Sequence, residues 1–359
     1  MSTKRVVIRT DANSGIGTGH FMRCLTLAEE LKKNGAQVCF VTRGLPPYLS
    51  QMLQDRSFNL YPLQEGGSAD VLDDLPHSKW LKVSQHRDAM QTLEALKNDR
   101  FDWLIIDHYA IDYRWESLLK GAAKKIMVID DLADRQHDCD VLLDQNYYHD
   151  MNQRYIGKVP DPCNLMLGPK YALLRDEFRE IRKYVKTRDG LIKNILIFFG
   201  GVDSRNYTTM AIEALVELGW SVDVNIVIGQ QHPNIKQLEE IAKVNNYKLH
   251  IQTSEMAKLM LKADLAIGAA GSASWERCCL GLPCLVVAVA DNQIQSAIDL
   301  SSVGASIYIG KYSEVNKFKI LKALREVVST KKIINCSIKC RQIVEPNGVC
   351  EISKLITGV

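Results

Sequence analysis

The sequence lacks an excess of charge of either sign. Its 359 residues include 45 lysines and arginines against 42 aspartates and glutamates, a formal net charge of +3. Such a small surplus cannot neutralise the many phosphates that a nucleic-acid site contacts. The charge balance therefore argues against a nucleic-acid partner and favours a small-molecule substrate.

Long apolar runs are missing as well. The N-terminal MSTKRVVIRT contains no apolar segment typical of a signal peptide. Farther along, no run reaches the roughly 18 apolar residues needed to cross a bilayer. We therefore expect a cytoplasmic protein without a membrane partner.

Cysteines at metal-ligand spacing are scarce, although the chain has ten cysteines. Cys24 and the adjacent pair Cys278 and Cys279 lie in apolar runs, and adjacent cysteines suit neither a disulfide framework nor a metal-binding turn. Cys336 and Cys340 lack a second pair of ligands. The sequence thus predicts reduced, buried thiols, no metal site and no cofactor.

Short β-rich runs alternate with amphipathic helical segments along the chain. A first series contains KRVVIR, QVCFVT, WLIID and KKIMVID, and a second contains NILIFFGG, VDVNIVIG, KLHIQ, ADLAIGAAG and PCLVVAVA. This alternation predicts the α/β class, with parallel sheets and crossover helices. Since the pattern occurs twice and 46% hydrophobic content is enough for two cores, we predict two doubly wound domains.

A charged segment, LRDEFREIRKYVKTRDGLIKN, separates the two series. It contains no β-rich run, which predicts a helix and a linker. We predict domains over residues 1–188 and 189–359, with the last helix packing back toward the N-terminal domain. Ligands of open parallel sheets bind beyond the carboxyl ends of the strands, so we expect the binding cleft to lie between the domains.

A glycine-rich loop, DANSGIGTGH, follows the first expected strand and leads into a helix. Without Cβ atoms at Gly15, Gly17 and Gly19, backbone N–H groups can approach an anionic ligand that the helix N-terminus attracts. The spacing is not GxGxxG, and the second strand ends in Thr42 and Arg43 rather than an acid, which argues against a dinucleotide oxidoreductase. A simple tight turn is the alternative interpretation.

His20 lies in the first turn of the helix that follows this loop, where an apolar stripe begins. The positive end of a helix disfavours imidazolium, so a neutral His20 that can accept a proton is expected. We predict that it acts as a general base. The alternative is a solvated or helix-capping histidine.

A second small-residue turn lies in ADLAIGAAGSASWERCCLGLP, where residues 268–272 offer unhindered backbone amides suited to a diphosphate. Glu276 follows one turn into the helix, where its carboxylate can accept both hydroxyls of a ribose. The alternative is a surface acid that favours the helix dipole. After the next strand, Asp291, Asn292 and Gln293 carry groups suited to sugar hydroxyls or acetamides, although Asp291 is equally a candidate helix cap.

Several segments together carry a resemblance to a known family: RTDANSGIGTGHFMRCLTLAEEL, DHYAIDYRWE, VIDDLADRQHDCDVLLDQNY, GPKYALLRDEF, ILIFFGGVDS, AIGAAGSASWERCCLGLP and ADNQ. The chain resembles the PseG family, the UDP-sugar hydrolases of pseudaminic acid biosynthesis, over nearly its whole length, with residues 336–359 matching only loosely. This resemblance implies a GT-B fold like that of the peptidoglycan glycosyltransferase MurG. It also implies hydrolysis of UDP-2,4-diacetamido-2,4,6-trideoxy-β-L-altropyranose to UDP and the free sugar.

With this resemblance, three groups of site residues are predicted. The catalytic base is His20. The expected UDP-binding residues are Gly17, Gly19, Gly200, Gly201, Ala270, Gly271, Ser272 and Glu276. The expected sugar-binding residues are Asp11, Tyr109, Asn292 and Gln293.

UDP is a good leaving group, and glycine amides and helix N-termini can stabilise its charge, so a single base is enough. We expect His20 to take a proton from water as the water attacks the anomeric carbon opposite UDP, with inversion. Two alternatives stay open: a MurG-like glycosyltransferase in which an acceptor hydroxyl replaces water, and a noncatalytic nucleotide-sugar-binding protein. A monomer is expected in each case.

Two further patterns are interpreted as structural. The DCD sequence at 138–140 matches the DxD of metal-dependent glycosyltransferases, but it precedes the run VLLDQN and predicts a strand-entry turn. The remaining histidines singled out lack companions at catalytic or ligand spacing and are predicted to be surface or hydrogen-bonded residues: His77, His86, His232 and His250.

Overall fold

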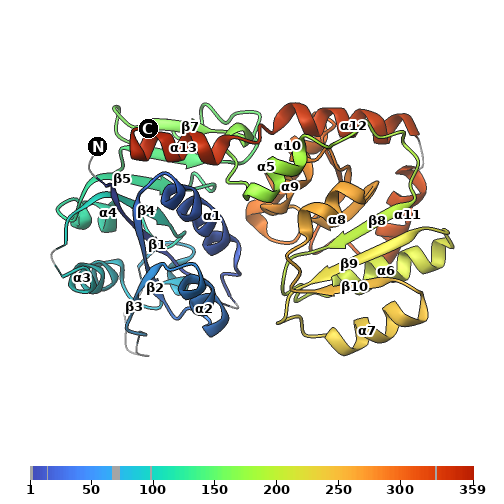
Figure 1. Cartoon of the computed structure of the whole chain (residues 1–359), viewed down its shortest axis with the longest axis horizontal. Helices are drawn as coiled ribbons and strands as arrows, with labels where there is room; N and C mark the ends of the chain where they lie inside the picture. The colour runs from blue at the N-terminus through green and yellow to red at the C-terminus, as the bar shows by residue number, and fades with distance from the viewer. Residues whose placement is uncertain (1–2, 14, 67–72, 98, 328–329) are drawn as a thin grey trace. The chain divides into compact units, whose positions relative to one another are not determined.

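Figure 1 shows the computed structural model of the chain, which describes residues 3–13, 15–66, 73–97, 99–327 and 330–359. The chain divides into two units, each with its own core. The first unit comprises Met1–Asn146, Asp150–Leu173 and Asn347–Val359, and the second comprises Tyr147–His149 and Leu174–Pro346.

The first unit is built on a parallel sheet. Its strands are β1 (Arg5–Thr10), β2 (Gln37–Arg43), β3 (Asn59–Leu63), β4 (Phe101–Asp107), β5 (Ala123–Ile129), β6 (Val141–Asp144) and β7 (Asn164–Leu167). Within the described residues they follow the order β3-β2-β1-β4-β5-β6-β7. Because this order reverses between β1 and β4, which pair Thr10 with Asp107, the loops after these two strands begin side by side. Such a switch point is where α/β sheets bind ligands.

Helices cover both faces of this sheet. They are α1 (Gly19–Lys33), α2 (Pro47–Asp55), α3 (Gln85–Ala95), α4 (Tyr113–Leu119), α13 (Gly348–Thr357) and the short 3-10 helices Ser78–Trp80 and Pro169–Tyr171. Along β4, Trp103 and Ile105 join one core, whereas Leu104 and Ile106 join the other. Burial on both faces explains why this strand is a continuous apolar run rather than an alternating one.

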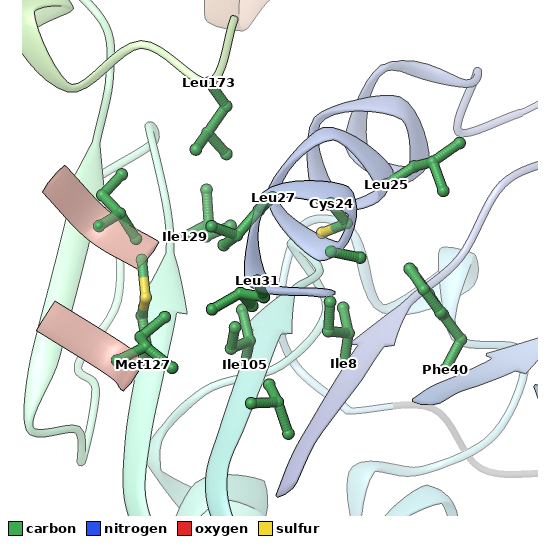
Figure 2. Close-up of a cluster of buried hydrophobic side chains, with 14 of the residues drawn as sticks. Ile8, Cys24, Leu25, Leu27, Leu31, Phe40, Ile105, Met127, Ile129 and Leu173 are labelled. Carbon is green, nitrogen blue, oxygen red and sulfur yellow. The ribbon is translucent and has the colours of Figure 1, made fainter. Parts of the chain in front are cut away.

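Figure 2 shows the first of these cores, in which α1 lies over the sheet with Leu31 near Ile105 and Leu27 near Ile129. The last helix of the chain, α13, completes this core with buried apolar residues that include Ile352. Trp103 Nε1 also donates a hydrogen bond to the carbonyl oxygen of a residue in α13, at 3.1 Å. The last helix is therefore an integral part of the first unit.

The second unit has a parallel sheet of the same kind. Its strands are β8 (Asn194–Phe198), β9 (Asp223–Ile228), β10 (Lys248–Ile251), β11 (Leu265–Ala269), β12 (Cys284–Ala288) and β13 (Ile307–Lys311). In the described residues their order is β10-β9-β8-β11-β12-β13, so the switch point lies between β8 and β11. The two doubly wound sheets confirm the predicted fold class.

The helices of this unit begin with α5 (Asp176–Arg182), α6 (Tyr207–Leu218), α7 (Ile235–Val244), α8 (Met256–Lys262) and α9 (Ala273–Cys279). The 3-10 helix Asp291–Gln293, α10 (Ile294–Ser302), α11 (Lys317–Val327) and α12 (Thr330–Ile343) follow. None of the helices in the described part of the chain is long and apolar enough to cross a membrane. All ten cysteines lie in described residues and are free thiols, of which only Cys163 and Cys350 are not fully buried.

The division between the units falls after Leu173, not near Asp189 as the charged segment predicted. The reason is that α5 packs against α8 and α9. Phe178 of α5 is fully buried, and Arg182 donates a hydrogen bond to the carbonyl oxygen of Cys279. The charged side chains from Asp176 to Arg182 thus belong to a helix of the second unit. Beyond the helix, Arg188 donates hydrogen bonds to the carbonyl oxygens of Gly281 and Ala263 in the same unit.

Candidate active site

His20 and Asp107 come together at the switch point of the first sheet. His20 is the second residue of α1, Asp107 is the last residue of β4, and both side chains are buried. His20 Nδ1 lies 2.6 Å from Asp107 Oδ1. An ionised Asp107 can only accept this hydrogen bond, so Nδ1 carries a proton, and in the neutral imidazole Nε2 then has the lone pair. This orientation suits a general base.

Arg23 holds Asp107 in its ionised form. Burial alone would raise the pKa of Asp107, but the charges and hydrogen bonds of Arg23 and His20 lower it well below its ordinary value. Arg23 lies one turn beyond His20 on the same side of α1. Its Nε and Nη2 atoms donate to the two carboxylate oxygens at 2.6 and 2.7 Å. This two-point contact fixes the plane of the carboxylate that orients His20.

Asp131, just after β5, extends the network. It accepts a hydrogen bond from Arg23 Nη1 at 3.1 Å and another from the hydroxyl of Tyr109. The predicted sugar-binding residue Tyr109 is therefore fixed through its hydroxyl, with its ring against His20. The two ring centroids are 4.5 Å apart and the planes are nearly perpendicular.

An aromatic wall, formed by His77, Trp80 and Tyr109, stands beside His20. Trp80 stacks on Tyr109 with a centroid separation of 5.4 Å, and its ring centroid lies 6.0 Å from that of His20. His77 contacts both Trp80 and Tyr109, at 4.7 and 5.3 Å. Burial lowers the pKa of His77 and favours its neutral form. The sequence did not indicate these ring contacts, because Tyr109 is distant from His77 in the chain.

The glycine-rich loop forms a compact turn before α1. Asn13 Oδ1 accepts hydrogen bonds from the backbone N–H groups of Gly15 and Ile16, at 2.8 and 3.0 Å. Gly17 has φ +80°, which explains the need for glycine there. A Cβ atom at Gly19 would meet no atom within 4 Å. The loop therefore leaves open space at the start of α1, next to His20.

Asp11, a predicted sugar contact, has several partners within the first unit. It is buried, and Arg9 and the backbone N–H of Arg43 donate hydrogen bonds to its carboxylate. His108 Nε2 lies 3.2 Å from the same carboxylate. Because these groups surround both oxygens, the carboxylate holds the loops after β1 and β4 together. These contacts give Asp11 a structural role, and its contact with a sugar stays a prediction.

The second unit brings its predicted glycine turns together at its own switch point. Gly200 and Gly201 follow β8, while Ala270, Gly271 and Ser272 follow the neighbouring β11. Gly200 has φ +97°, and a Cβ atom there would meet nothing within 4 Å. Gly200 therefore presents unhindered backbone at this edge of the sheet. In the second turn, the Ala270 N–H already donates to the carbonyl oxygen of Val287 at 2.9 Å, and a Cβ atom at Gly271 would lie 3.6 Å from Gln293 Nε2.

Glu276 lies one turn into α9, and its side chain has a partner that the sequence did not reveal. Arg175 Nη2 and Nε donate hydrogen bonds to Glu276 Oε1 at 2.9 and 3.2 Å. The Glu276 side chain is 19% exposed. A ligand that uses this carboxylate would therefore bind beside Arg175.

Other groups at this edge are occupied by the protein itself. The carboxylate of Asp203 accepts hydrogen bonds from the backbone N–H groups of Tyr207 and Thr208, so it fills the N-terminus of α6. Gln293 Oε1 accepts a hydrogen bond from the backbone of Val289 at 3.0 Å. Asn292 lies beside Gln293 in a 3-10 helix and is partly exposed.

The DCD segment at 138–140 serves the fold. Asp138 accepts hydrogen bonds from Ser117 and Lys120, and Asp140 accepts one from the backbone N–H of Ile126. Across the described ranges, no group of three or more histidine, cysteine, aspartate or glutamate side chains is arranged to hold a metal ion.

Comparison with known proteins agrees with this architecture. Residues 194–343 match the glycosyltransferase family 28 C-terminal domain. The crystal structure of MurG from Acinetobacter baumannii superposes with a TM-score of 0.64 at 18% identity, covering 99% of this chain and 100% of that one. The chain has a GT-B fold.

Two curated relatives cover most of this GT-B chain. The UDP-2,4-diacetamido-2,4,6-trideoxy-beta-L-altropyranose hydrolase of Campylobacter jejuni is 29% identical over 305 residues, which are 84% of this chain and 98% of that protein. The spore coat polysaccharide biosynthesis protein SpsG of Bacillus subtilis is 23% identical over 357 residues, which are 98% of this chain and 97% of that protein.

The sequence missed several residues of the GT-B chain's candidate site: Arg23, Trp80, Asp107, Asp131 and Arg175. Two of them carry a signal. Asp107 ends a predicted strand next to the glycine loop's strand, and Arg23 follows His20 at helical i,i+3 spacing. Trp80 follows no predicted strand, so its contact with His20 depends on tertiary structure alone.

Proposed function

We propose that the protein is a nucleotide-sugar hydrolase in which His20 activates water for attack on the anomeric carbon. The observation that carries this proposal is the hydrogen bond from His20 Nδ1 to Asp107, an ionised carboxylate clamped by Arg23. It leaves Nε2 to accept the proton of water. Asp107 orients the ring and stabilises the imidazolium formed in the transition state, as the carboxylate does in other acid–histidine pairs.

The second unit is proposed to hold the UDP moiety. The backbone around Gly200, Gly201, Gly271 and Ser272 suits the diphosphate, and the Glu276 carboxylate suits the ribose hydroxyls. The Ala270 N–H donates to the carbonyl oxygen of Val287 at 2.9 Å, so Ala270 would contribute through its place in the turn and not through its amide. On this proposal, Gly17 and Gly19 of the first unit are further contacts of the UDP moiety. The sugar would then lie beside Tyr109, Asn292 and Gln293.

The substrate we propose is UDP-2,4-diacetamido-2,4,6-trideoxy-β-L-altropyranose, whose hydrolysis belongs to pseudaminic acid biosynthesis. Support comes from the shared sequence segments and from the name of the Campylobacter jejuni relative, at 29% identity. Displacement of UDP by water opposite the leaving group gives the free sugar with inversion. We further propose that the enzyme works as a cytoplasmic monomer without metal or cofactor.

The test is to incubate the purified protein with this UDP-sugar without an acceptor and to measure UDP release. His20→Asn should lower kcat by roughly 10²- to 10⁴-fold while UDP affinity stays near that of the unchanged protein. In ¹⁸O-labelled water, the label should enter the sugar and not UDP, and the first anomer formed should be inverted. Label in UDP, a retained anomer or an unchanged kcat for His20→Asn would reject the proposal.

A glycosyltransferase is the second candidate, because residues 194–343 match a glycosyltransferase family 28 domain. In that case a sugar or lipid hydroxyl would take the place of water, with His20 still the base. UDP release that depends on an added acceptor, and is negligible without it, would favour this candidate. A protein that binds UDP-sugars but releases no UDP under either condition would be a noncatalytic binder.

A further inference from the structure

Trp80 is the one member of the aromatic wall in the described residues that combines contact with His20 and partial exposure. Tyr109 is buried and fixed by Asp131, and His77 touches the wall only through Trp80 and Tyr109. Stacking on the fixed ring of Tyr109, with planes inclined by 22°, holds the indole of Trp80 in place. The wall therefore offers a ligand a preset apolar surface.

The distances bring a substrate of His20 within reach of this surface. A general base lies about 3 Å from the water that it activates, and the water lies about 3 to 3.5 Å from the carbon that it attacks. The anomeric carbon would thus lie roughly 6 Å from His20 Nε2. The Trp80 ring centroid is itself 6.0 Å from that of His20, so a pyranose at this position is within reach of the indole.

Chemistry determines which sugar the wall favours. An indole face offers dispersion contacts to C–H groups but no acceptor for a hydroxyl. A methyl group at carbon 6 gains from burial against it, whereas a hydroxyl at carbon 6 loses hydrogen bonds to water. We propose that Trp80 is a specificity-determining residue that packs against the apolar face of the sugar and its methyl at carbon 6, selecting 6-deoxy sugars. This inference rests on the proposed function.

The experiment measures binding in a His20→Asn background, where chemistry does not interfere. The probes are UDP-N-acetylglucosamine, its 6-deoxy analogue and UDP alone, titrated by calorimetry. In this background the 6-deoxy sugar should bind about 10- to 100-fold more tightly than the 6-hydroxyl sugar, the range that one substituent achieves in an apolar pocket. Adding Trp80→Ala should reduce this ratio to about 3-fold or less, with UDP affinity unchanged.

Two further variants separate recognition from folding. Trp80→Phe keeps an aromatic face and should retain most of the preference. Tyr113→Ala removes a 44% exposed aromatic residue from α4 and should leave the preference intact. The inference would be overturned if the affinity ratio of the two UDP-sugars were the same with and without the indole. It would also be overturned if Trp80→Ala lost UDP affinity in parallel, or if neither UDP-sugar bound.

The same data distinguish this inference from the proposed hydrolysis. If the preference depends on Trp80 but the unchanged protein releases no UDP from the diacetamido sugar, the inference stands and hydrolysis fails. If UDP is released but the preference does not depend on Trp80, hydrolysis stands and the inference is overturned.

Discussion

The imidazole of His20 and the carboxylate of Asp107 meet at 2.6 Å although 87 residues separate them in the chain. They meet because β1 and β4 are neighbours in the sheet, so the helix after β1 starts beside the last residue of β4. Arg23 closes the arrangement by binding the same carboxylate. Each of these three side chains limits the positions of the other two, so a substitution at one of them should change the orientation of the His20 ring.

Asp107→Asn should lower kcat by roughly 10²- to 10⁴-fold, because an amide cannot stabilise imidazolium and permits the wrong tautomer of His20. UDP affinity should change little. The double variant with His20→Asn should be hardly slower than either single variant, since the two residues act as a unit. Asp102→Asn is the matched control on the same strand, where Asp102 pairs with Lys124. Steady-state kinetics would contradict the role of Asp107 if both aspartate variants kept full kcat.

Alanine substitutions at Gly17 and at Gly19 should affect different properties: the first should lower stability, and the second should lower UDP-sugar affinity. Gly17→Ala forces φ +80° on a residue with a Cβ and should cost about 1 to 2 kcal/mol of unfolding free energy. Gly19→Ala adds a methyl to open space, so stability should hold while UDP-sugar affinity falls. Urea denaturation and calorimetry measure the two effects. Undiminished affinity in Gly19→Ala would show that no ligand occupies that space.

Glu276→Ala should weaken UDP binding by about 1 to 3 kcal/mol, the scale of lost charge-assisted hydrogen bonds. Arg175→Ala should not weaken it, because it frees Oε1 of Glu276 for the ribose. Glu255→Ala, at an exposed ion pair with Lys258, is the control. If calorimetry finds equal UDP affinity in all three variants, Glu276 serves only to hold α5 through Arg175.

Asp144 should make stability depend on pH. Burial, reinforced by the charge of Asp131, raises the pKa of Asp144 to about 8, against about 3.9 in an unfolded chain. Between these values the folded state holds a proton that the unfolded state has lost, so stability should fall as pH rises from about 4 to 8. The side chain in Asp144→Asn cannot ionise. The free energy of unfolding of this variant, relative to that of the unchanged protein, should therefore rise between pH 5 and pH 9. If the urea midpoints of the variant and the unchanged protein differ by the same amount at pH 5 and at pH 9, the raised pKa of Asp144 is refuted.

The sequence was sufficient to predict the central strands of the sheets but not most of the edge strands. Strands such as β4 and β12 are buried on both faces and therefore appear as unbroken apolar runs. The edge strand β3 is partly exposed and contains Pro62, and β7 has four residues with only Met166 buried. At β13 the register shifts beside β12. Edge strands have one neighbour and less burial, so their apolar pattern is weak.

For the candidate site, the sequence located loops but not partners. His20 stood out because a glycine loop precedes a helix, a pattern contained within ten residues. The contacts of Arg23 with Asp107 and Asp131 span 84 and 108 residues, so no local pattern encodes them. For Asp11, its place in the glycine-rich loop did not reveal its hydrogen bonds with Arg9 and with the backbone N–H of Arg43.

The place of α13 in the first unit affects the order in which the chain can fold. Val349, Ile352 and Ile356 complete a core that begins at β1, yet the ribosome adds them only after the whole second unit. At roughly 5 to 20 residues per second, synthesis of the second unit takes on the order of ten seconds or more. During that interval the nascent first unit exposes the apolar surface of α1 that α13 later covers. The first unit should therefore mature last, and its incomplete form is the one that chaperones would encounter.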